Sequence, residues 1–230
     1  DDTLIVGEGL YVSLPGKNSD LPLAEGIPAA RELVLTSSKS IRLAGLSGVG
    51  KTRFVQALFE EGFETNPLDR TKVIYGDIGF GVEPSATVIV DTLLAENRDA
   101  ILVLDNCAKE EHSLIVNRIA RTKSTIKLIT IEYDIRDDTP QTTEVVRMTA
   151  RGTAITEQLV ARRYPQLGRL NARRIADFSG GNARLALALA DALPVNVSLA
   201  GLSDEELFER LFEQRHESDN NLREQAEVLS

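Results

Sequence analysis

Residues 45–52 have the sequence Gly45-Leu46-Ser47-Gly48-Val49-Gly50-Lys51-Thr52. The run matches the pattern G-x-x-x-x-G-K-[ST] at every fixed position. Glycines have no Cβ atom, so a loop that contains three of them can turn sharply and aim successive backbone N–H groups at one point. A phosphate group fits such a point. The run therefore predicts a loop that binds the phosphates of a nucleotide.

The two residues that close the run have separate expected roles. Lys51 supplies a compact cation that can follow the β- and γ-phosphates, and the Thr52 hydroxyl can bind the Mg²⁺ that bridges them. A helix that starts at Lys51 would add the positive end of its dipole. We therefore expect ATP or ADP and Mg²⁺ as cofactors. The residues expected to contact the nucleotide are Gly45, Ser47, Gly48, Val49, Gly50, Lys51, Thr52 and Arg53.

The sequence on either side of the loop agrees with this interpretation. Residues 41–44 are expected to form a short strand, and Phe54, Val55, Leu58 and Phe59 form an apolar stripe at helical spacing. The alternative is a glycine-rich turn that caps an ordinary helix, and such a turn requires neither feature. The predicted strand, loop and helix favour nucleotide binding.

A second motif is the apolar run at 100–104 that ends in Asp105. An apolar run without alternation is typical of a central parallel strand that is covered on both faces. Its acid would emerge at the carboxyl end of the strand, beside the loop, where it can hold Mg²⁺ through water. Many strands end in Asp, but its place after a phosphate-binding loop favours the metal role, with Thr52 as the other expected metal ligand.

The position after Asp105 is occupied by Asn106, where many ATPases have a second acid that activates water. Asparagine can orient a water molecule but cannot accept its proton, so we expect slow hydrolysis. Glu110 and Glu111 could substitute for the acid, or they could simply form a solvated helix face. Thr130, near the end of the fourth expected strand, is a candidate sensor of the γ-phosphate, although threonine is also common in strands for its β-propensity.

Strands and helices are expected to alternate in the first 150 residues. This alternation predicts an α/β fold with a parallel, doubly wound sheet. Residues 1–38 are expected to lead into a nucleotide-binding core at 39–150. Strands are expected at 4–6, 10–12, 41–44, 72–75, 100–105, 125–131 and 144–148, and helices at 27–35, 51–59, 85–96 and 108–121.

After residue 150 only helices are expected. They lie at 153–164, 171–178, 182–193, 203–215 and 220–229, and Ser203-Asp204-Glu205-Glu206 is a capping box. Six arginines and one acid, Asp177, lie between residues 158 and 190, whereas nine acids and three arginines lie from 203 to the end. The arginines call for an anion such as a triphosphate, or they pair with the acidic C-terminal helices.

Composition excludes several classes of protein. The formal charge of -9 argues against a broad nucleic-acid-binding or membrane-binding face. The single cysteine, Cys107, can form no intrachain disulfide and suits a reducing compartment. No apolar run approaches the roughly 20 residues of a membrane span, and no signal peptide opens the chain. We expect a cytoplasmic protein, without membrane partners or direct nucleic-acid binding, and a piece of something longer.

The run Phe178-Ser179-Gly180-Gly181-Asn182-Ala183-Arg184 looks like the signature of ABC transporters, but it lies after the strand that ends in Asp105 instead of before it, and this order excludes that family. It resembles the lid of AAA+-related ATPases of the STAND class (signal-transduction ATPases with numerous domains, including the NACHT and NB-ARC groups), in which a Gly-Asn-Pro-Arg-like turn begins a lid helix. The motifs at 48–53, 103–106 and 180–184 follow in the same order as in that class, and the resemblance covers residues from about 40 to 200.

This resemblance implies a five-stranded sheet of order 5-1-4-3-2, a helical lid at 151–198 that closes over ATP, and the start of a helical or winged-helix region at 199–230. It implies that Arg184 approaches the phosphates, which adds Arg184 to the candidate catalytic residues Lys51, Asp105, Asn106 and Thr130. Ala183 replaces the proline that is usual in the turn.

The resemblance also implies a nucleotide-dependent switch with slow or assembly-dependent hydrolysis. Such a switch senses a ligand through a further region, forms a homo-oligomer and activates an effector region, in some bacterial members for antiviral defence. Two other functions stay open. A DNA-acting AAA+ motor or loader is disfavoured by the acidic balance, and a P-loop kinase would need an acceptor motif, of which we find no sign.

Overall fold

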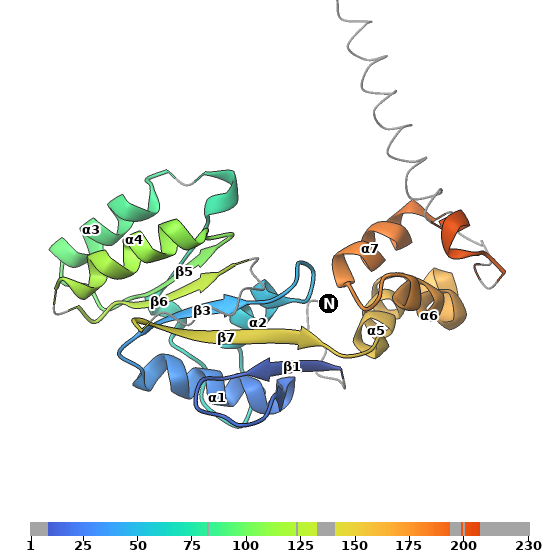
Figure 1. Cartoon of the computed structure of the whole chain (residues 1–230), viewed down its shortest axis with the longest axis horizontal. Coiled ribbons are helices and arrows are strands. Elements are labelled where there is room, and N and C mark those ends of the chain that lie inside the picture. The colour runs from blue at the N-terminus through green and yellow to red at the C-terminus, as the bar shows by residue number, and fades with distance from the viewer. Residues whose placement is uncertain are drawn as a thin grey trace, which may run out of the picture. The chain divides into compact units, whose positions relative to one another are not determined.

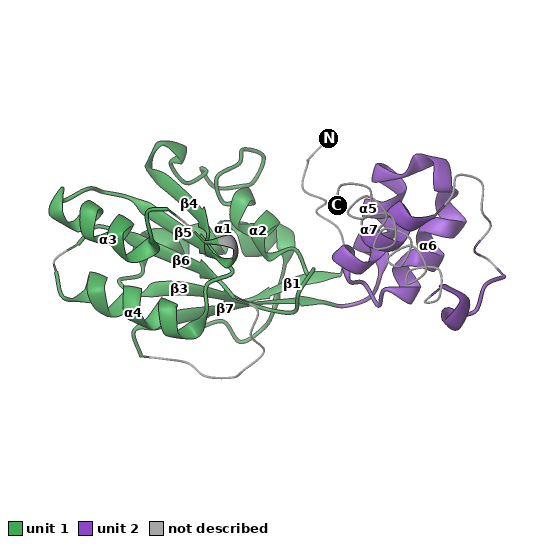
Figure 2. Ribbon diagram, turned by 90° about the horizontal axis from the view of Figure 1, so that it is seen from above, with its two compact units in different colours: residues 1–150 green, residues 151–230 purple. Residues whose placement is uncertain are grey.

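The computed structural model describes residues 9–81, 83–122, 124–132, 141–193, 199 and 201–207. The chain divides into two compact units, Asp1–Ala150 and Arg151–Ser230 (Figure 2). The strand predicted at 4–6, the helix predicted at 220–229 and most of the helix predicted at 203–215 lie outside the described residues. Within the described ranges, no helix is long and apolar enough to cross a membrane.

The first unit is built on a seven-stranded sheet of order β2-β1-β7-β3-β6-β5-β4. The strands are β1 (Leu10–Ser13), β2 (Leu21–Pro22), β3 (Ser40–Ala44), β4 (Val73–Asp77), β5 (Ile101–Asp105), β6 (Lys127–Ile131) and β7 (Thr143–Ala150). Strands β7, β3, β6, β5 and β4 are parallel to one another, so this part of the sheet has the order 5-1-4-3-2 when its strands are numbered among themselves. β1 pairs antiparallel with both β2 and β7.

The sheet therefore has two strands more than the five that the resemblance implies, and one of them, β1, matches the strand expected at 10–12. β2 is only two residues long and contains Pro22, which has no N–H group and is tolerated in a sheet only at an edge or a bulge. β1 joins the sheet through β7, from Leu10 opposite Ala150 to Ser13 opposite Arg147. Because this pairing joins the two ends of the unit, no local pattern indicates it.

Helices cover both faces of the sheet, with α3 and α4 on one side and α1 on the other (Figure 1). Their bounds are α1 (Leu23–Thr36), α2 (Lys51–Ala57), α3 (Ala86–Ala95) and α4 (Lys109–Ala120). Successive side chains of a strand point to opposite faces. In β5, Ile101 and Val103 belong to the core cluster of α1 and α2, whereas Leu102 and Leu104 belong to the cluster of α3 and α4. This double burial explains why the strand is apolar without alternation.

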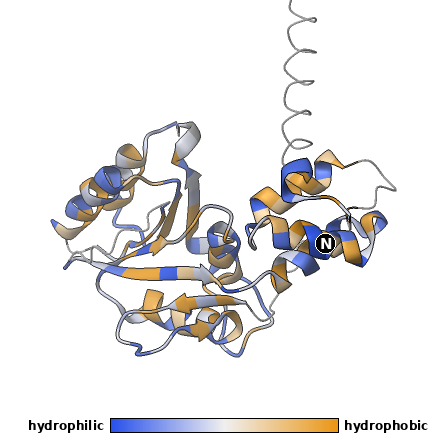
Figure 3. Ribbon diagram, turned by 45° about the vertical axis from the view of Figure 1, so that its right-hand side comes forward, coloured by the Kyte–Doolittle hydropathy of each residue, from blue (hydrophilic) through white to orange (hydrophobic). Residues whose placement is uncertain are grey.

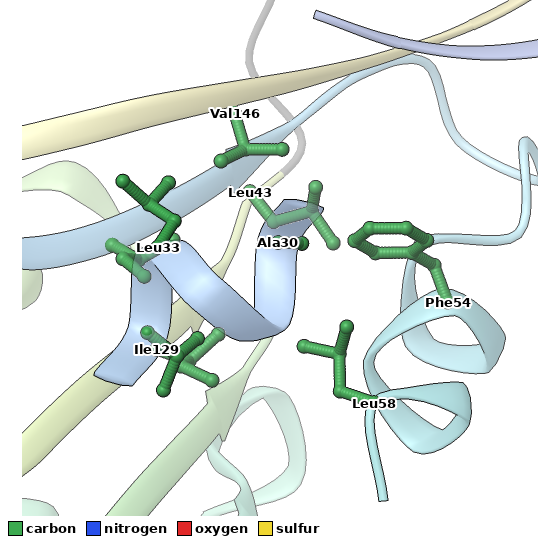
Figure 4. A pocket seen from close by; sticks show the side chains of 9 residues that line it. Ala30, Leu33, Leu43, Phe54, Leu58, Ile129 and Val146 are labelled. Carbon is green, nitrogen blue, oxygen red and sulfur yellow. The ribbon is translucent and has the colours of Figure 1, made fainter. Parts of the chain in front are cut away.

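The core between α1, α2 and the sheet contains one small cavity of about 10 Å³ (Figure 4). Its lining is entirely apolar: Ala30, Leu33, Val34, Ile41, Leu43, Phe54, Leu58, Ile129 and Val146. A space of this size holds at most about one water molecule and offers no polar partner. The cavity is a packing defect of the core, distinct from the predicted nucleotide site.

A buried arginine fixes the end of α2. Arg31 of α1 is 1 % exposed, and its guanidinium donates hydrogen bonds to the carbonyl oxygens of Ala57 and Leu58, both at 2.9 Å, and to that of Glu60. It also donates to the carbonyl oxygen of Thr65 at 2.5 Å. The last carbonyl groups of a helix have no partner within the helix, and the five N–H donors of arginine supply it here. α1 therefore anchors the helix that follows the phosphate-binding loop.

The described residues of the second unit form helices joined by turns, as predicted. They are α5 (Ala154–Arg163), α6 (Gly168–Phe178) and α7 (Ala183–Ala192), with a 3₁₀ turn at Pro165–Leu167. Each carries hydrophobic and hydrophilic residues (Figure 3), and the apolar ones share a core that includes Val160, Ile175 and Leu189. The capping box is confirmed, because the Ser203 N–H donates to Glu206 Oε2 at 2.7 Å and the Glu206 N–H donates to Ser203 Oγ at 3.2 Å.

Candidate functional site

Residues 45–52 connect β3 to α2, as the sequence indicated. Gly48 has φ 78° and Gly50 has φ 98°, a left-handed conformation that favours glycine. Gly45 is required for a different reason as well: a Cβ atom there would lie 2.6 Å from the carbonyl oxygen of Met148 in β7. The glycines thus let the loop turn and lie directly against the neighbouring strand.

The loop presents several backbone donors. Among the described residues, the N–H groups of Gly48, Gly50 and Thr52 form no hydrogen bond, whereas the Val49 N–H donates to the Leu46 carbonyl at 3.3 Å. Buried or half-buried N–H groups normally have an acceptor. A bound phosphate could accept all three of them.

The Lys51 ammonium lies inside the loop. Nζ donates to the carbonyl oxygens of Gly45 at 2.7 Å and Leu46 at 2.9 Å, and the residue is 9 % exposed. These carbonyls hold the cation against the first two residues of the loop. The predicted contact Arg53 is engaged elsewhere, because its guanidinium pairs with the Glu60 carboxylate at 2.8 Å.

The structure brings the two predicted metal ligands together. Thr52 Oγ1 donates to Asp105 Oδ2 at 2.7 Å, although 53 residues separate them in the chain. Tyr75 of β4 donates to the same oxygen at 3.1 Å. Burial, and then the nearby Asp105 carboxylate, raise the pKa of Tyr75 to about 12, so its hydroxyl remains a donor at neutral pH. Asp105 itself is 6 % exposed.

A second acid lies beside this pair that the sequence analysis did not identify. Asp77 ends β4 in register with Asp105, which ends β5. The side-chain amide of Asn106 donates to Asp77 Oδ1 at 2.8 Å, and the Asn106 backbone N–H donates to Asp105 Oδ1 at 2.8 Å. The available signal was that residues 73–77, like 101–105, end in Asp, but our predicted strand stopped at Tyr75.

We call Thr52, Tyr75, Asp77, Asp105 and Asn106 the edge network. Alternation along the strands explains why its members meet. Val73 packs on the same core cluster as Ile101 and Val103, so Tyr75 and Asp77 on β4 share a face with Asp105 on β5. That face is the one covered by α2, which carries Thr52.

Thr130 belongs to a different group. Its hydroxyl lies 2.8 Å from Nδ1 of His112 in α4, and the other ring nitrogen of His112 lies 2.9 Å from the Thr143 hydroxyl. Thr130 is 0 % exposed. Its sensor role stays a prediction, and the contact with His112 competes with it.

The face of the sheet that carries Thr130 also holds a buried ion pair, with 3.5 Å between Arg42 Nη1 and Glu132 Oε2. We call Arg42, His112, Thr130, Glu132 and Thr143 the internal network. Arg42 is directly opposite Thr130 in the sheet, and α4 covers the group.

Arg184 lies in the second unit, in the first turn of α7. The turn before it has Gly180 at φ 57° and Gly181 at φ 82°, and the Asn182 side chain caps the helix by accepting the Leu185 N–H at 3.1 Å. A Cβ atom on Gly181 would lie 2.7 Å from the Gly152 carbonyl oxygen. The turn leaves Arg184 exposed.

Some of the other arginines are explained by pairing with acids. Arg174 bonds Asp204 at 2.6 Å and the Leu202 carbonyl at 2.9 Å, which is a contact with the acidic C-terminal segment. Arg169 lies 3.3 Å from Glu157. The alternative of pairing with the acidic C-terminal segment thus accounts for Arg174, whereas the partner of Arg169 lies in α5.

No protein-family model matches the sequence, and neither does any curated protein. Among solved structures, the AAA+ ATPase PCH-2 from C. elegans is similar with a TM-score of 0.51 and 10 % identity, over 90 % of this chain and 75 % of that chain. At this identity the likeness shows the fold alone, and that fold is a P-loop NTPase fold.

Two further structures are similar at lower TM-scores. One is a STAND protein with a tetratricopeptide repeat sensor from Pyrococcus horikoshii, with a TM-score of 0.44 and 13 % identity over 88 % of this chain. The chain spans 33 % of that protein's length. The other is a chain of the HORMA:CdnC:Trip13 complex of E. coli MS115-1, with a TM-score of 0.45 and 13 % identity, over 80 % of this chain and 76 % of that chain.

Proposed function

We propose that the chain binds Mg²⁺–ATP at residues 45–52 and hydrolyses it slowly. One observation carries the proposal: Thr52 and Asp105 meet at 2.7 Å beside a loop whose N–H groups at Gly48, Gly50 and Thr52 are available to an anion. In P-loop NTPases these two positions hold the metal while the loop cradles the phosphates.

The residues present fit a nucleotide with its metal. Lys51 would exchange the carbonyls of Gly45 and Leu46 for the β- and γ-phosphates. Thr52 would bind Mg²⁺ directly and Asp105 would hold it through water. Among the described residues, no group of three His, Cys, Asp or Glu side chains could hold a metal, which agrees with an ion that takes its remaining ligands from phosphates and water.

We further propose that the nucleotide acts as a switch of the STAND type. Arg184 of α7 would contact the γ-phosphate, so that triphosphate favours a closed arrangement of the two units about residues 149–153. ATP must bind the closed form more tightly than the open form, because equal affinity would shift nothing. Homo-oligomerisation, a sensor region and an effector region, with a role in defence, would then complete the signalling function in the whole protein.

Thermal unfolding with and without ATP–Mg²⁺ tests the nucleotide site. Ligand at about 100 times its Kd stabilises the folded state by about 2.7 kcal/mol. We expect Lys51→Ala to lose most of the ATP-dependent rise in Tm. Lys39→Ala is the matched control, because Lys39 directly precedes β3, at the end away from the loop, and pairs with Glu144. An equal rise in Tm for all three proteins would contradict the site.

A further inference from the structure

The paired side chains of Asp77 and Asn106 bear on which residue accepts the proton of the attacking water. The residue after Asp105 is an amide, which cannot accept the proton of an attacking water. The structure places a carboxylate on the next strand in direct contact with that amide, 2.8 Å from Asn106 Nδ2 to Asp77 Oδ1. We propose that Asp77 is the proton acceptor in ATP hydrolysis. This inference rests on the proposed function.

The position of Asp77 fits this role. It lies at the carboxyl end of β4 in register with Asp105, on the face of the sheet that is covered by α2, the helix that carries Thr52. The carboxyl ends of parallel strands meet at the edge where ligands bind in open α/β sheets. A water molecule at the γ-phosphate would therefore face the ends of both strands.

The hydrogen bonds of the pair leave the required atoms available. Asp77 Oδ1 accepts from Asn106 Nδ2 and from the Gly79 N–H at 3.1 Å, and no described residue donates to Oδ2. Because an ionised carboxylate only accepts, Asn106 must turn its NH₂ group toward Asp77. The carbonyl oxygen of the Asn106 amide is then directed away and can accept a hydrogen bond from the attacking water.

The backbone holds Asn106 in this orientation. Asn106 has φ 54°, a left-handed conformation that asparagine adopts more readily than most residues. A Cβ atom on Gly79 would lie 3.0 Å from the Cβ atom of Asn106, so the turn after β4 packs tightly on the Asn106 side chain. The pair is thus fixed from both strands.

Other acids near the site are less suitable. Asp105 accepts from Thr52 and Tyr75 at Oδ2 and from the Asn106 N–H at Oδ1, so both of its oxygens are engaged. Glu110 and Glu111 lie in the first turn of α4, and α4 packs on the opposite face of the sheet from α2. Asp77 alone combines the correct face with an oxygen that has no donor among the described residues.

The proposed step conserves atoms and electrons. The water oxygen forms a bond to the γ-phosphorus while the bond from that phosphorus to the β–γ bridging oxygen breaks, and ADP leaves with the electron pair. One water proton moves to Asp77 Oδ2, and Asp77 then releases it to solvent. The products are ADP, inorganic phosphate and one proton.

The experiment is a single-turnover measurement of ATP hydrolysis on the full chain, next to thermal unfolding with ATP–Mg²⁺. Asp77→Asn keeps an acceptor for the Gly79 N–H, and we expect it to retain the ATP-dependent rise in Tm. Its hydrolysis rate should fall about 100-fold or more, as expected for the loss of a general base. A rate within about threefold of the original protein would overturn the proposal, since a general base contributes far more.

The matched control is Asp69→Asn. Asp69 caps the 3₁₀ turn Arg70–Lys72 before β4 by accepting the Thr71 N–H at 2.9 Å, as Asp77 caps the turn Ile78–Phe80 after β4. Asp69→Asn should hydrolyse ATP at the original rate. A loss equal to that of Asp77→Asn would mean that capping of these turns, and not proton transfer, limits the rate, and would overturn the proposal.

A double variant, Asp77→Asn with Asn106→Asp, separates chemistry from structure. It exchanges the acid and the amide, so the side-chain pair can still form its hydrogen bond and one carboxylate is again present. We expect it to recover much of the rate that Asp77→Asn loses. If the rate stays low although the hydrogen bond is kept, a purely structural role of Asp77 is excluded, and the carboxylate is required at position 77 itself. An original protein that ATP–Mg²⁺ fails to stabilise would refute the proposed function, whereas one that is stabilised but hydrolyses no ATP would refute the role of Asp77 alone.

Discussion

The edge network and the internal network lie on opposite faces of the same sheet, the first on β4 and β5 and the second on β3, β6 and β7, and their surroundings differ. In the edge network Tyr75 is 53 % exposed and Asn106 is exposed, Thr52 and Asp77 are half-buried, and Asp105 is buried. In the internal network Thr130 and Arg42 are 0 % and 1 % exposed, beneath α4. The difference shows that a polar residue near the end of a strand belongs to a ligand site only if it also lies on the correct face.

Alternation of side chains decides which network a residue joins. Ile129 and Ile131 of β6 pack on the cluster of α1 and α2, so Thr130 between them faces α4. The side chain of Asp105 points to the same face of the sheet as those of Ile101 and Val103, which is the face that α2 covers. Asp105, the predicted metal ligand, and Thr130, the predicted sensor of the γ-phosphate, therefore point to opposite faces of the sheet.

The largest expected effect tests whether the internal network is structural. Glu132→Leu removes the carboxylate beside the buried Arg42 guanidinium, and we expect it to lower the free energy of unfolding by about 3–5 kcal/mol. Urea denaturation measures the loss. The double variant Arg42→Met with Glu132→Leu should be closer to the original protein, because no charge then remains buried at the site.

The control for this prediction is Glu144→Leu, which breaks the partly exposed pair between Lys39 and Glu144 at 3.0 Å. A pair near the surface contributes at most about 1 kcal/mol. If both variants lower the free energy of unfolding by a similar amount, the buried pair of Arg42 and Glu132 contributes no more than the partly exposed pair of Lys39 and Glu144.

A smaller effect is expected at Thr130, the residue with two competing roles. Thr130→Val keeps the shape of the side chain and removes one hydrogen bond to His112, so the free energy of unfolding should fall by about 1 kcal/mol. The rise in Tm with ATP–Mg²⁺ should be unchanged. If the free energy of unfolding is unchanged but ATP–Mg²⁺ no longer raises Tm, the Thr130 hydroxyl instead contacts the γ-phosphate.

The smallest effect concerns Tyr75 in the edge network and appears only at high pH. The pKa of Tyr75 is raised to about 12 in the folded chain, mainly by burial and then by Asp105, from an ordinary value of about 10. A raised pKa favours the neutral phenol in the folded state, so its contribution to stability is complete below about pH 10 and is lost between about pH 10 and 12.

We therefore expect Tm to fall more steeply over this window in the original protein than in Tyr75→Phe. Tyr164, whose pKa is also raised, is present in both proteins and cancels in the comparison. Parallel pH profiles would show that the bond from Tyr75 to Asp105 does not persist in solution.

The sequence predicted those elements whose structure depends on residues that are close together in the chain. The loop at 45–52, the strand ending in Asp105 and the helices after residue 150 follow from motif and periodicity. The pairing of β1 with β7 depends on residues at opposite ends of the unit, as Leu10 opposite Ala150 shows. The face of Thr130 was not predictable, because β6 is apolar on both sides. Asp77 was missed because Gly76 interrupts the apolar pattern just before it.

Arg31 has a practical consequence for how this protein is shortened. Sequence alone would place the start of an independent core at residue 39, but a protein that began there would lack the guanidinium that binds the carbonyls of Ala57, Leu58, Glu60 and Thr65. The carbonyl oxygens at and after the end of α2 would lose the donor that links them to α1, although those of Ala57 and Leu58 keep the N–H groups of Glu60 and Leu68. Such a truncation should yield little folded material, and the productive choice is to begin before α1, at Leu10 or earlier, so that β1 is kept as well.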